Sequence, residues 1–240
     1  MKIFSWRNIR LMLMFAVVIF LFAFTSKRNN ERKVVRTEVI FNGENNLFLK
    51  PETVNKLLIE NKTLASAIEK DGLDLNKLEK KVNGHQLIEK SEVFVSIDGV
   101  LKAVVKQKAP VVRVFDETGS FYIDYDGNRM PLSPIYAARV PLVSGEIDGE
   151  KEAELKKLFR FIHDDDFLRK NIIGIEVLPN GGLKMMNRNF NYEIDFGKPI
   201  NVERKFNNYK AFFQKAVLDS TLYNYKKINL KFTQQVVCTK

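Results

Sequence analysis

Residues 91–105 read SEVFVSIDGVLKAVV and contain the clearest local pattern in the chain. Apolar residues alternate with others on both sides of Asp98-Gly99, as in strands that bury one face. Asp-Gly favours the positive φ angles of a two-residue type I′ turn. The stretch therefore predicts a β-hairpin whose inward residues are Val93, Val95 and Ile97 on one strand and Leu101, Ala103 and Val105 on the other.

Upstream of this hairpin, the pattern predicts one more strand and two helices. Residues 34–41 alternate in the same way. Pro51 suits the first turn of a helix, and Asp74 suits the N-cap of a second one. The order strand, helix, helix, strand, strand predicts a small α+β domain over residues 34–109, with a three-stranded sheet and both helices on one face. The first strand would turn one face inward, carrying Val35, Thr37, Val39 and Phe41.

Downstream of the hairpin, residues 110–240 predict a second domain, a mixed β-sheet with flanking helices. Amphipathic helices are expected over 151–162 and 202–217, where apolar residues recur every three or four positions. Short strands are expected at 111–115, 120–124, 172–178, 183–186, 192–196, 226–232 and 234–237. The overall fold class predicted is α+β.

An apolar run near the N-terminus predicts a membrane anchor. Residues 11–24 read LMLMFAVVIFLFAF, and a helix over 9–26 spans roughly 27 Å at 1.5 Å per residue. Residues 1–8 would then be a cytoplasmic tail and 27–33 a short linker. A cleavable signal peptide is the alternative, but Ala23-Phe24-Thr25 matches its small-x-small cleavage site poorly.

The orientation of this anchor depends on two opposing signals. Three basic residues precede the apolar run 11–24, and five follow it within residues 27–36, which is the reverse of the positive-inside pattern. A long downstream domain is translocated largely regardless of charge, and a very short N-terminal tail usually stays inside. We therefore expect an inner-membrane, single-pass protein with a cytoplasmic N-terminus and both domains outside.

Composition limits the remaining function classes. The chain has 240 residues and a formal net charge of +10, but its basic residues are interleaved with acidic ones, so nucleic-acid binding is not expected. Cys238 is the single cysteine, which excludes an intramolecular disulfide and a cysteine zinc cluster.

A search of the sequence for catalytic or metal-binding patterns finds none for which a simple structural explanation is excluded. The run His163-Asp164-Asp165-Asp166 is interpreted as a solvated helix end that leads into a loop, and Asp124-x-Asp126-Gly127-Asn128 as a hairpin turn without the remaining calcium ligands. Gly181-Gly182 lies in a turn and opens no helix, so it is no phosphate loop. We expect no catalytic residues, no cofactor and no metal, and hence a binding protein.

Several motifs, in order along most of the chain, resemble the bacterial cell-division family FtsQ/DivIB. The small domain resembles the POTRA module that this family carries next to the membrane. The junction at 106–114 has Gln107 and Lys108 where the family usually has an acidic–basic or acidic–amide pair, and residues 61–72 look like an insertion. The motifs that carry the resemblance are residues 91–105, the junction, Tyr122–Leu132 (YIDYDGNRMPL), Pro141–Gly145 (PLVSG) and Ile228–Phe232 (INLKF).

The resemblance implies a divisome scaffold at the division septum. It would bind the small coiled-coil membrane proteins FtsB and FtsL, with septal peptidoglycan synthases as further partners. In the family the partner pairs with the last strand of the β domain, a mode that relies on the unpaired backbone groups of a sheet edge. Carried over to this sequence, the partner-binding edge would contain Ile228, Leu230, Phe232, Gln234 and Val236, although alternation allows only one face of it to be exposed.

Three other functions remain open at this point. The chain could be another POTRA-bearing protein of envelope assembly or secretion, although neither repeated POTRA modules nor a barrel are visible. It could be a membrane-anchored envelope enzyme, which a cell-wall hydrolysis assay on residues 34–240 would reveal. It could also be a domain released by cleavage, which an intact N-terminus in membrane fractions would exclude.

Overall fold

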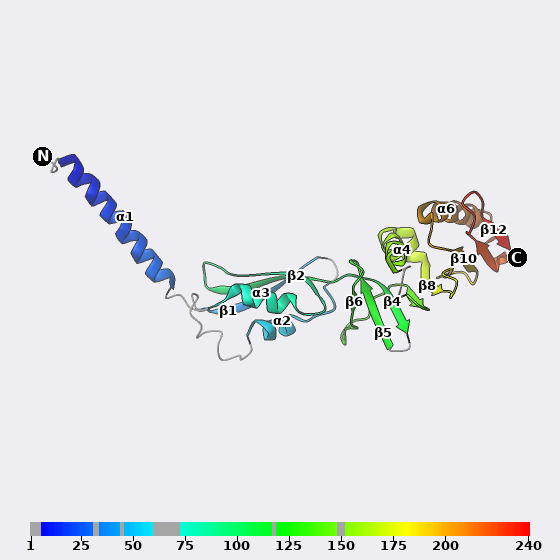
Figure 1. The fold of residues 1–240 in the computed structure, drawn as a ribbon, viewed down its shortest axis with the longest axis horizontal. Helices are drawn as coiled ribbons and strands as arrows, with labels where there is room; N and C mark the ends of the chain where they lie inside the picture. Colours follow the sequence, from blue (N-terminus) through cyan, green and yellow to red (C-terminus); the bar gives the residue numbers. More distant parts are fainter. Residues whose placement is uncertain (1–5, 31–33, 44–45, 60–72, 117–118, 148–151) are drawn as a thin grey trace. The chain divides into compact units, whose positions relative to one another are not determined.

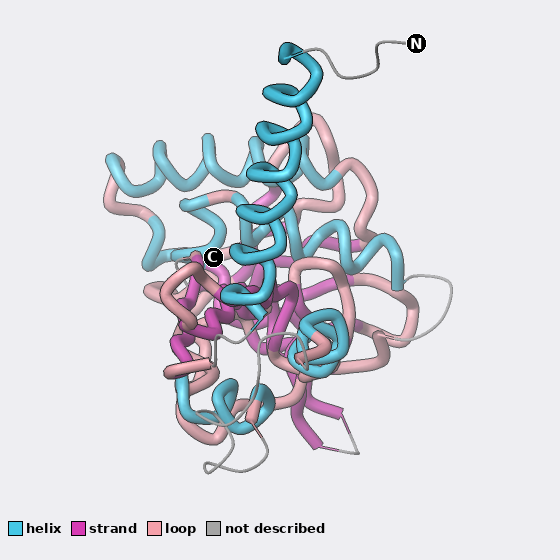
Figure 2. Tube along the Cα trace, turned by 90° about the vertical axis from the view of Figure 1, so that its left-hand side faces the viewer, coloured by secondary structure: helices cyan, strands magenta, loops and turns pink. Residues whose placement is uncertain are grey.

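A computed structural model describes residues 6–30, 34–43, 46–59, 73–116, 119–147 and 152–240 (Figure 1). Of Arg7 and residues 28–30 it describes the backbone alone. The chain divides after Gln107 into two compact units, two residues before the predicted domain boundary. Helices and strands both contribute to the fold (Figure 2), which belongs to the predicted α+β class. The proposed insertion at 61–72 lies outside the described residues.

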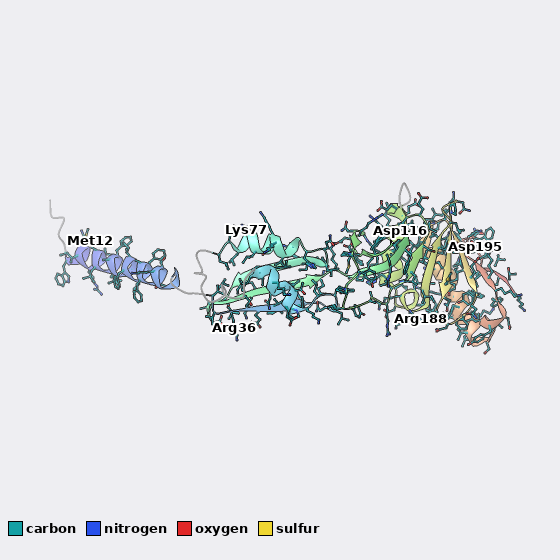
Figure 3. The ribbon with its side chains drawn as sticks, turned by 90° about the horizontal axis from the view of Figure 1, so that it is seen from below. Met12, Arg36, Lys77, Asp116, Arg188 and Asp195 are labelled. Carbon is teal, nitrogen blue, oxygen red and sulfur yellow. The ribbon has the colours of Figure 1, made fainter. Side chains whose placement is uncertain are left out.

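Helix α1 (Trp6–Asn30) contains the predicted membrane segment. Its residues Asn8–Lys27 are long and apolar enough to cross a bilayer by length and composition. Side chains project from it on all sides, Met12 among them, and its large apolar residues are exposed (Figure 3). The helix extends past residue 26 into the predicted linker, of which residues 31–33 lie outside the described part.

The small unit contains one three-stranded sheet among its described residues, with strand order β1-β3-β2. Strand β1 runs parallel to β3, and β2 pairs antiparallel with β3. The elements are β1 (Arg36–Asn42), α2 (Pro51–Leu58), α3 (Leu75–Asn83), β2 (Ile88–Val95) and β3 (Val100–Gln107). This is the predicted order of strand, helix, helix, strand and strand.

The inward face of this sheet carries most of the predicted apolar positions. The prediction was wrong for Val35, which is 67% exposed, whereas the preceding Val34 is buried. Register aligns Val39 with Ala103, and Ala103 with Val93, so that the alternating residues of all three strands share one face. Val54 of α2 and Val82 of α3 are fully buried, and each helix packs on one strand of the sheet. As predicted, Asp74 caps α3, because its Oδ1 accepts a hydrogen bond from the backbone amide of Lys77 at 3.0 Å.

The tip of the hairpin differs from the prediction. The amide of Gly99 donates to the carbonyl of Ser96 at 3.0 Å, so the loop consists of Ile97, Asp98 and Gly99. Gly99 has φ +82°, whereas Asp98 is not among the described residues with positive φ. A type I′ turn needs positive φ at both positions, so this is a three-residue loop that ends in a left-handed glycine. Ile97 consequently lies at the tip rather than on the buried face.

The large unit is built on a nine-stranded mixed sheet within its described residues, with order β12-β11-β10-β9-β8-β7-β4-β5-β6. Strands β8, β9 and β10 form the predicted antiparallel meander, and β7 joins them to β4 by parallel pairing on both sides. The strands are β4 (Pro110–Asp116), β5 (Gly119–Asp124), β6 (Arg129–Met130), β7 (Leu142–Ser144), β8 (Ile172–Val177), β9 (Leu183–Asn187), β10 (Glu193–Gly197), β11 (Lys227–Asn229) and β12 (Val237–Thr239).

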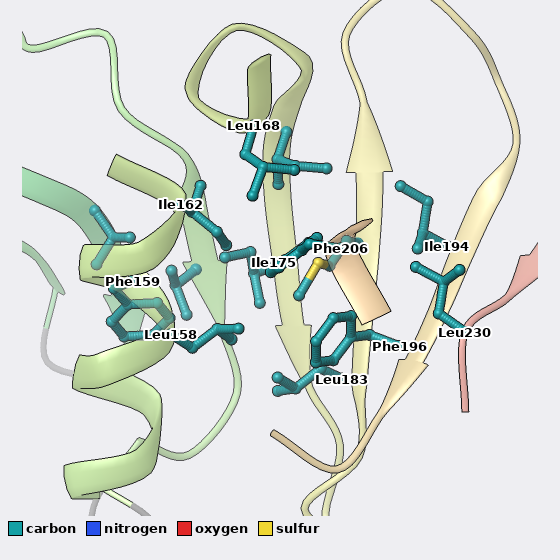
Figure 4. Close-up of a cluster of buried hydrophobic side chains, with 14 of the residues drawn as sticks. Leu158, Phe159, Ile162, Leu168, Ile175, Leu183, Ile194, Phe196, Phe206 and Leu230 are labelled. Carbon is teal, nitrogen blue, oxygen red and sulfur yellow. The ribbon is translucent and has the colours of Figure 1, made fainter. Parts of the chain in front are cut away.

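One face of this sheet forms the core with helices α4 (Glu152–Asp164), α5 (Asp166–Asn171) and α6 (Val202–Leu218). A continuous register row crosses eight strands on that face. Figure 4 shows members of this core on α4, α6 and the central strands. Burial of each large apolar side chain contributes about 1.5–3 kcal/mol, so this row fixes which face each strand turns inward. The row consists of Cys238, Ile228, Ile194, Met185, Ile175, Val143, Val114 and Phe121.

The acidic run at residues 163–166 lies at a helix end with Asp164 and Asp166 exposed, as predicted, but it leads into a second helix and not into a loop. Helix α4 ends at Asp164, and Asp165 is the N-cap of α5, where its Oδ1 accepts from the amide of Leu168 at 3.0 Å. The other carboxylate oxygen of Asp165 contacts the ammonium of Lys210 on α6. The run therefore joins three helices rather than leading into a loop.

Candidate partner-binding edge

Strand β12 is one edge of the large sheet. It pairs antiparallel with β11 and with no other strand among the described residues. Cys238 aligns with Ile228, and Val237 with Asn229. The side of β12 that faces away from β11 therefore presents backbone amide and carbonyl groups that another strand can pair with.

The boundaries of the last strands differ from those predicted. The sequence predicts a strand over 226–232, but β11 ends at Asn229. The side-chain oxygen of Asn229 accepts a hydrogen bond from the amide of Lys231 at 2.9 Å, which takes that amide out of the sheet ladder. The chain then passes α6, where Asn208 donates to the carbonyl of Thr233 at 3.0 Å, before it returns as β12.

The five predicted edge residues consequently divide into two groups. Ile228 and Leu230 are fully buried in the core. Phe232 is 51% exposed, Gln234 is exposed, and Val236 is half-buried against the core. Only Ile228 lies within a strand, so the five do not form one alternating row, and their role in partner binding stays a prediction.

The core side of the edge is apolar. Cys238 lies half-buried at the end of the register row, and burial raises the pKa of its thiol. The core against which Cys238 packs also contacts Tyr225, which packs edge-on against Phe212 of α6 with ring centres 5.5 Å apart. A strand added beside β12 would therefore find an apolar environment on this face.

The opposite face near the edge carries an ion-pair network. The carboxylate of Asp195 on β10 (Figure 3) lies 2.9 Å from the ammonium groups of both Lys227 and Lys231. Glu193 on the same strand pairs with Lys184 on β9 at 2.9 Å and with Lys227 at 3.7 Å. The network thus connects three neighbouring strands and the segment that follows β11.

The charges of this network shift the titration of its members. Burial raises the pKa of Asp195, but hydrogen bonds from Lys227 and Lys231 outweigh burial, so the pKa lies below its ordinary value. The hydrogen bond to Asp195 in turn raises the pKa of Lys227. Asp195 and Lys227 are therefore charged at neutral pH, and the network fixes the position of β11 relative to β10.

Helix α6 is attached to the meander by buried polar groups. Lys205 is almost fully buried, and its ammonium donates to the carbonyls of Phe196 at 2.9 Å and Lys198 at 2.8 Å. Burial lowers the pKa of this lysine. Near the middle of the helix, the hydroxyl of Tyr209 lies 2.8 Å from that of Tyr192. These contacts hold the helix over the strands that support the edge.

The ion-pair network was not predicted, although the sequence contains a signal for it. Glu193 and Asp195 are two positions apart on a predicted strand, so they share a face, and Lys227 and Lys231 lie on the predicted strand 226–232 that follows α6. Opposite charges on neighbouring strands are expected to pair when the strands are adjacent. What the sequence does not indicate is that β11 lies beside β10.

Neither histidine has the surroundings of a catalytic group. Burial lowers the pKa of His85, whose Nδ1 accepts from the amide of Leu87 at 3.2 Å, and burial also lowers the pKa of His163. Within the described ranges, no group of three or more His, Cys, Asp or Glu side chains could hold a metal ion. A cavity of about 190 Å³ lies between β7, α4 and the β8–β9 turn, and among the described residues that line it Glu146 is the one ionisable residue.

These features define an α+β protein with one N-terminal helix long enough to span a membrane and a large open sheet. A family model described as FtsQ/DivIB, C-terminal related, matches residues 109–239, which is more than half of the chain. The chain therefore belongs to the FtsQ/DivIB family, as its motifs indicate. FtsQ/DivIB is a non-enzymatic family of division scaffolds, so membership suggests a role in cell division. No curated protein matches the chain.

Proposed function

We propose that this protein is a membrane-anchored scaffold of the bacterial division machinery. In this proposal it binds coiled-coil membrane proteins of the FtsB/FtsL type through the edge strand β12 and links them to septal peptidoglycan synthases. The observation that carries the proposal is the position of β12, a sheet edge paired on one side only, within the part of the chain that the family model matches.

The surroundings of β12 favour an amphipathic partner strand. Side chains of an added strand alternate between the two faces of the sheet. On one face they would meet the apolar surroundings of Cys238 and Tyr225, and on the other the charged groups of Lys227 and Asp195. Main-chain hydrogen bonds would supply affinity, and the contrast between the two faces would select the register of the partner.

The exposed segment before β12 adds a second contact region. Phe232 is half-exposed although its ring is apolar, and Gln234 next to it is exposed. Large aromatic side chains contribute strongly to binding where a partner buries them at the centre of an interface. In this proposal the partner covers Phe232 and Gln234 and pairs with β12, whereas Ile228 and Leu230 support the strand from inside the core.

The remaining parts of the chain have positions that suit such a scaffold. Helix α1 would cross the inner membrane once, with residues 1–8 in the cytoplasm and both units outside. The strand–helix–helix–strand–strand order of the small unit is the order expected of a POTRA-like module. That unit would lie next to the membrane and offers two sheet edges of its own, β1 and β2.

Live imaging combined with depletion tests the division role. An N-terminal fluorescent fusion is expected to form a ring at midcell, and depletion of the native protein is expected to produce filamentous cells. The same fusion, solubilised in mild detergent, should copurify with proteins of the FtsB/FtsL type. A uniform envelope signal with normal division would contradict the proposal.

A further inference from the structure

The hairpin tip and the start of β1 lie at the same end of the small sheet. Strand β1 is parallel to β3, and the register pairs Arg36 (labelled in Figure 3) with Val100. One residue earlier, the amide of Val35 donates to the carbonyl of Gly99 at 2.9 Å. The loop Ser96–Gly99 is therefore attached directly to the residue through which the chain enters this unit from α1.

This end of the unit exposes apolar side chains. Ile97, in the middle of the loop, is 86% exposed, and Val35 beside it is 67% exposed. Single exposed apolar residues are ordinary on protein surfaces. Here, however, two exposed β-branched apolar residues lie at the same end of one sheet. One of them, Ile97, lies in a turn, where polar residues are usual.

The charges around the tip compensate one another. The hydrogen bond with Ser96 and the attraction of Lys102 and Arg36 lower the pKa of Asp98. Lys102 also pairs with Glu38 at 3.5 Å. Two basic and two acidic groups thus leave the tip without a net charge, so anionic lipids are not needed to attract it.

The covalent connection keeps the tip close to the end of α1. Helix α1 ends at Asn30, and Val35 follows five residues later. Five extended residues span at most roughly 17 Å. The apolar segment ends at Lys27, and three further helical residues add roughly 4.5 Å. The headgroup layer of a bilayer is itself roughly 5–8 Å thick, so Val35 and Ile97 remain within reach of it.

We propose that this hairpin tip contacts the lipid bilayer, with Ile97 and Val35 at the boundary between headgroups and acyl chains. The proposal rests on α1 spanning the membrane, as in the proposed function, and it holds on whichever side of the membrane the unit lies. The contact would limit the orientations that the small unit can take relative to the membrane. The ligand is a lipid surface, and no partner protein is required.

Fluorescence quenching by spin-labelled lipids tests this contact in the full chain. The single native thiol is removed by Cys238→Ser, and Ile97→Cys carries an environment-sensitive fluorophore. The matched control is Leu47→Cys, which is 52% exposed in the same unit but follows β1 and so lies toward the opposite end of the sheet. Both proteins are reconstituted in phosphatidylcholine vesicles that contain lipids spin-labelled at a shallow acyl position, and iodide serves as the aqueous quencher.

At position 97 we expect at least twofold stronger quenching by the lipid label, and at least twofold weaker quenching by iodide, than at position 47. A second reporter at Val35→Cys should show the same preference and lose it when Ile97→Asp is added. Equal quenching at 97 and 47 in protein that floats with the vesicles would overturn the tip contact alone. Protein that fails to float would overturn the membrane anchor as well. Circular dichroism checks that each variant keeps its fold.

Discussion

The side-chain oxygen of Asn229 accepts a hydrogen bond from the backbone amide of Lys231, and this bond marks the end of β11. The amide of Leu230 still donates to the carbonyl of Asp195 on β10 at 2.9 Å, but the segment 231–236 leaves the sheet before the chain returns as the edge strand β12. Apolar alternation through 228–232 continues across this point without a change in pattern. The end of the strand is therefore set by a side-chain-to-backbone bond rather than by hydrophobic periodicity.

Phe232, in the segment released by this bond, gives the first prediction. Phe232→Asp should weaken binding of the FtsB/FtsL-type partner by roughly tenfold or more, because an exposed aromatic anchor is lost and a charge is buried in its place. The free energy of unfolding should change by less than about 0.5 kcal/mol, since the ring is half-exposed. Copurification from detergent extracts and urea unfolding measure the two effects. Tyr223→Asp, at an exposed aromatic residue before β11, is the control and should leave binding unchanged.

A comparison of alanine substitutions at Gly145 and Gly119 separates the effect of one steric contact from the effect of backbone strain. Both have positive φ, +96° and +136°, so alanine is strained at either position. A Cβ on Gly145 would lie 2.1 Å from the carbonyl oxygen of Val177, whereas a Cβ on Gly119 would meet nothing within 4 Å. Gly119→Ala should cost about 1–2 kcal/mol, and Gly145→Ala on the order of 3 kcal/mol or more. Urea unfolding of the two variants measures the difference, and equal losses would show that the β7–β8 approach can relax.

Lys205 provides a test of the buried cation that holds α6. Lys205→Met keeps the length of the side chain but leaves the carbonyls of Phe196 and Lys198 without their donor. The free energy of unfolding should fall by about 1–3 kcal/mol. Arg204→Met, at the exposed neighbouring position, should change it by less than about 0.5 kcal/mol. A Lys205 variant as stable as the Arg204 variant would mean that water replaces the ammonium group at no cost.

The lowered pKa of Asp195 leads us to expect that the free energy of unfolding depends on pH in the acid range. Its pKa in the folded protein lies below the ordinary value of 3.8, so the folded state binds the proton less readily than the unfolded state. The contribution of its ion pairs is therefore complete above pH 3.8 and declines as the pH falls through the lower folded-state pKa. Asp195→Asn should cost about 1–3 kcal/mol at neutral pH, because the side chain is nearly buried between two ammonium groups.

The difference between wild type and Asp195→Asn should shrink as the pH falls below 3.8, and chemical unfolding at a series of pH values measures it. Glu92→Gln is the control, because Glu92 and its partner Lys90 are both largely exposed and such surface pairs contribute little. A difference that stays constant down to strongly acid pH would indicate that the shape of the side chain, and not its charge, is what matters.

These cases also explain which parts of the structure could be predicted from sequence. The hairpin at 88–107, the Asp74 cap and the apolar faces of α4 and α6 follow from local periodicity and capping, which the chain carries within a few residues. The predicted loop Asp98-Gly99 was one residue too short, because an Asp-Gly sequence also fits a three-residue loop that ends in glycine, here Ile97–Gly99. Both kinds of turn place the same two strands together.

The pairing of strands that are far apart in the chain could not be predicted from the sequence. Strand β7 is three residues long and pairs in parallel on both sides, so its position depends on strands far away in the chain. The same holds for β11 and β10, whose adjacency creates the network around Asp195. A lysine in an amphipathic helix is expected to be exposed to solvent, and only the tertiary structure shows that Lys205 is buried. A partner-binding sheet edge was thus proposed from the sequence, but the strand that forms the edge of the sheet, β12, was identified only from the structure.

The last prediction concerns the backbone of β12 itself. The carbonyl of Thr239 accepts from the amide of Lys226 at 2.8 Å, which directs the backbone groups of Thr239 toward β11. Successive residues of a strand direct their backbone groups to opposite sides, so the amide and carbonyl of Cys238 point to the free side. A partner strand would use both of these groups.

Cys238→Pro removes the outward amide and leaves the pairing with β11 in place, as proline is tolerated on an edge whose N–H faces solvent. The affinity for the FtsB/FtsL-type partner should fall about tenfold or more, the equivalent of about 1.4 kcal/mol. Cys238→Ala is the matched control, because it also lacks the thiol but keeps the amide, and it should bind like wild type. Binding of the reconstituted full chain to labelled partner measures both, with circular dichroism as the check of the fold. Equal affinity of the two variants would mean that the partner does not pair with β12, because an added strand cannot do without that amide.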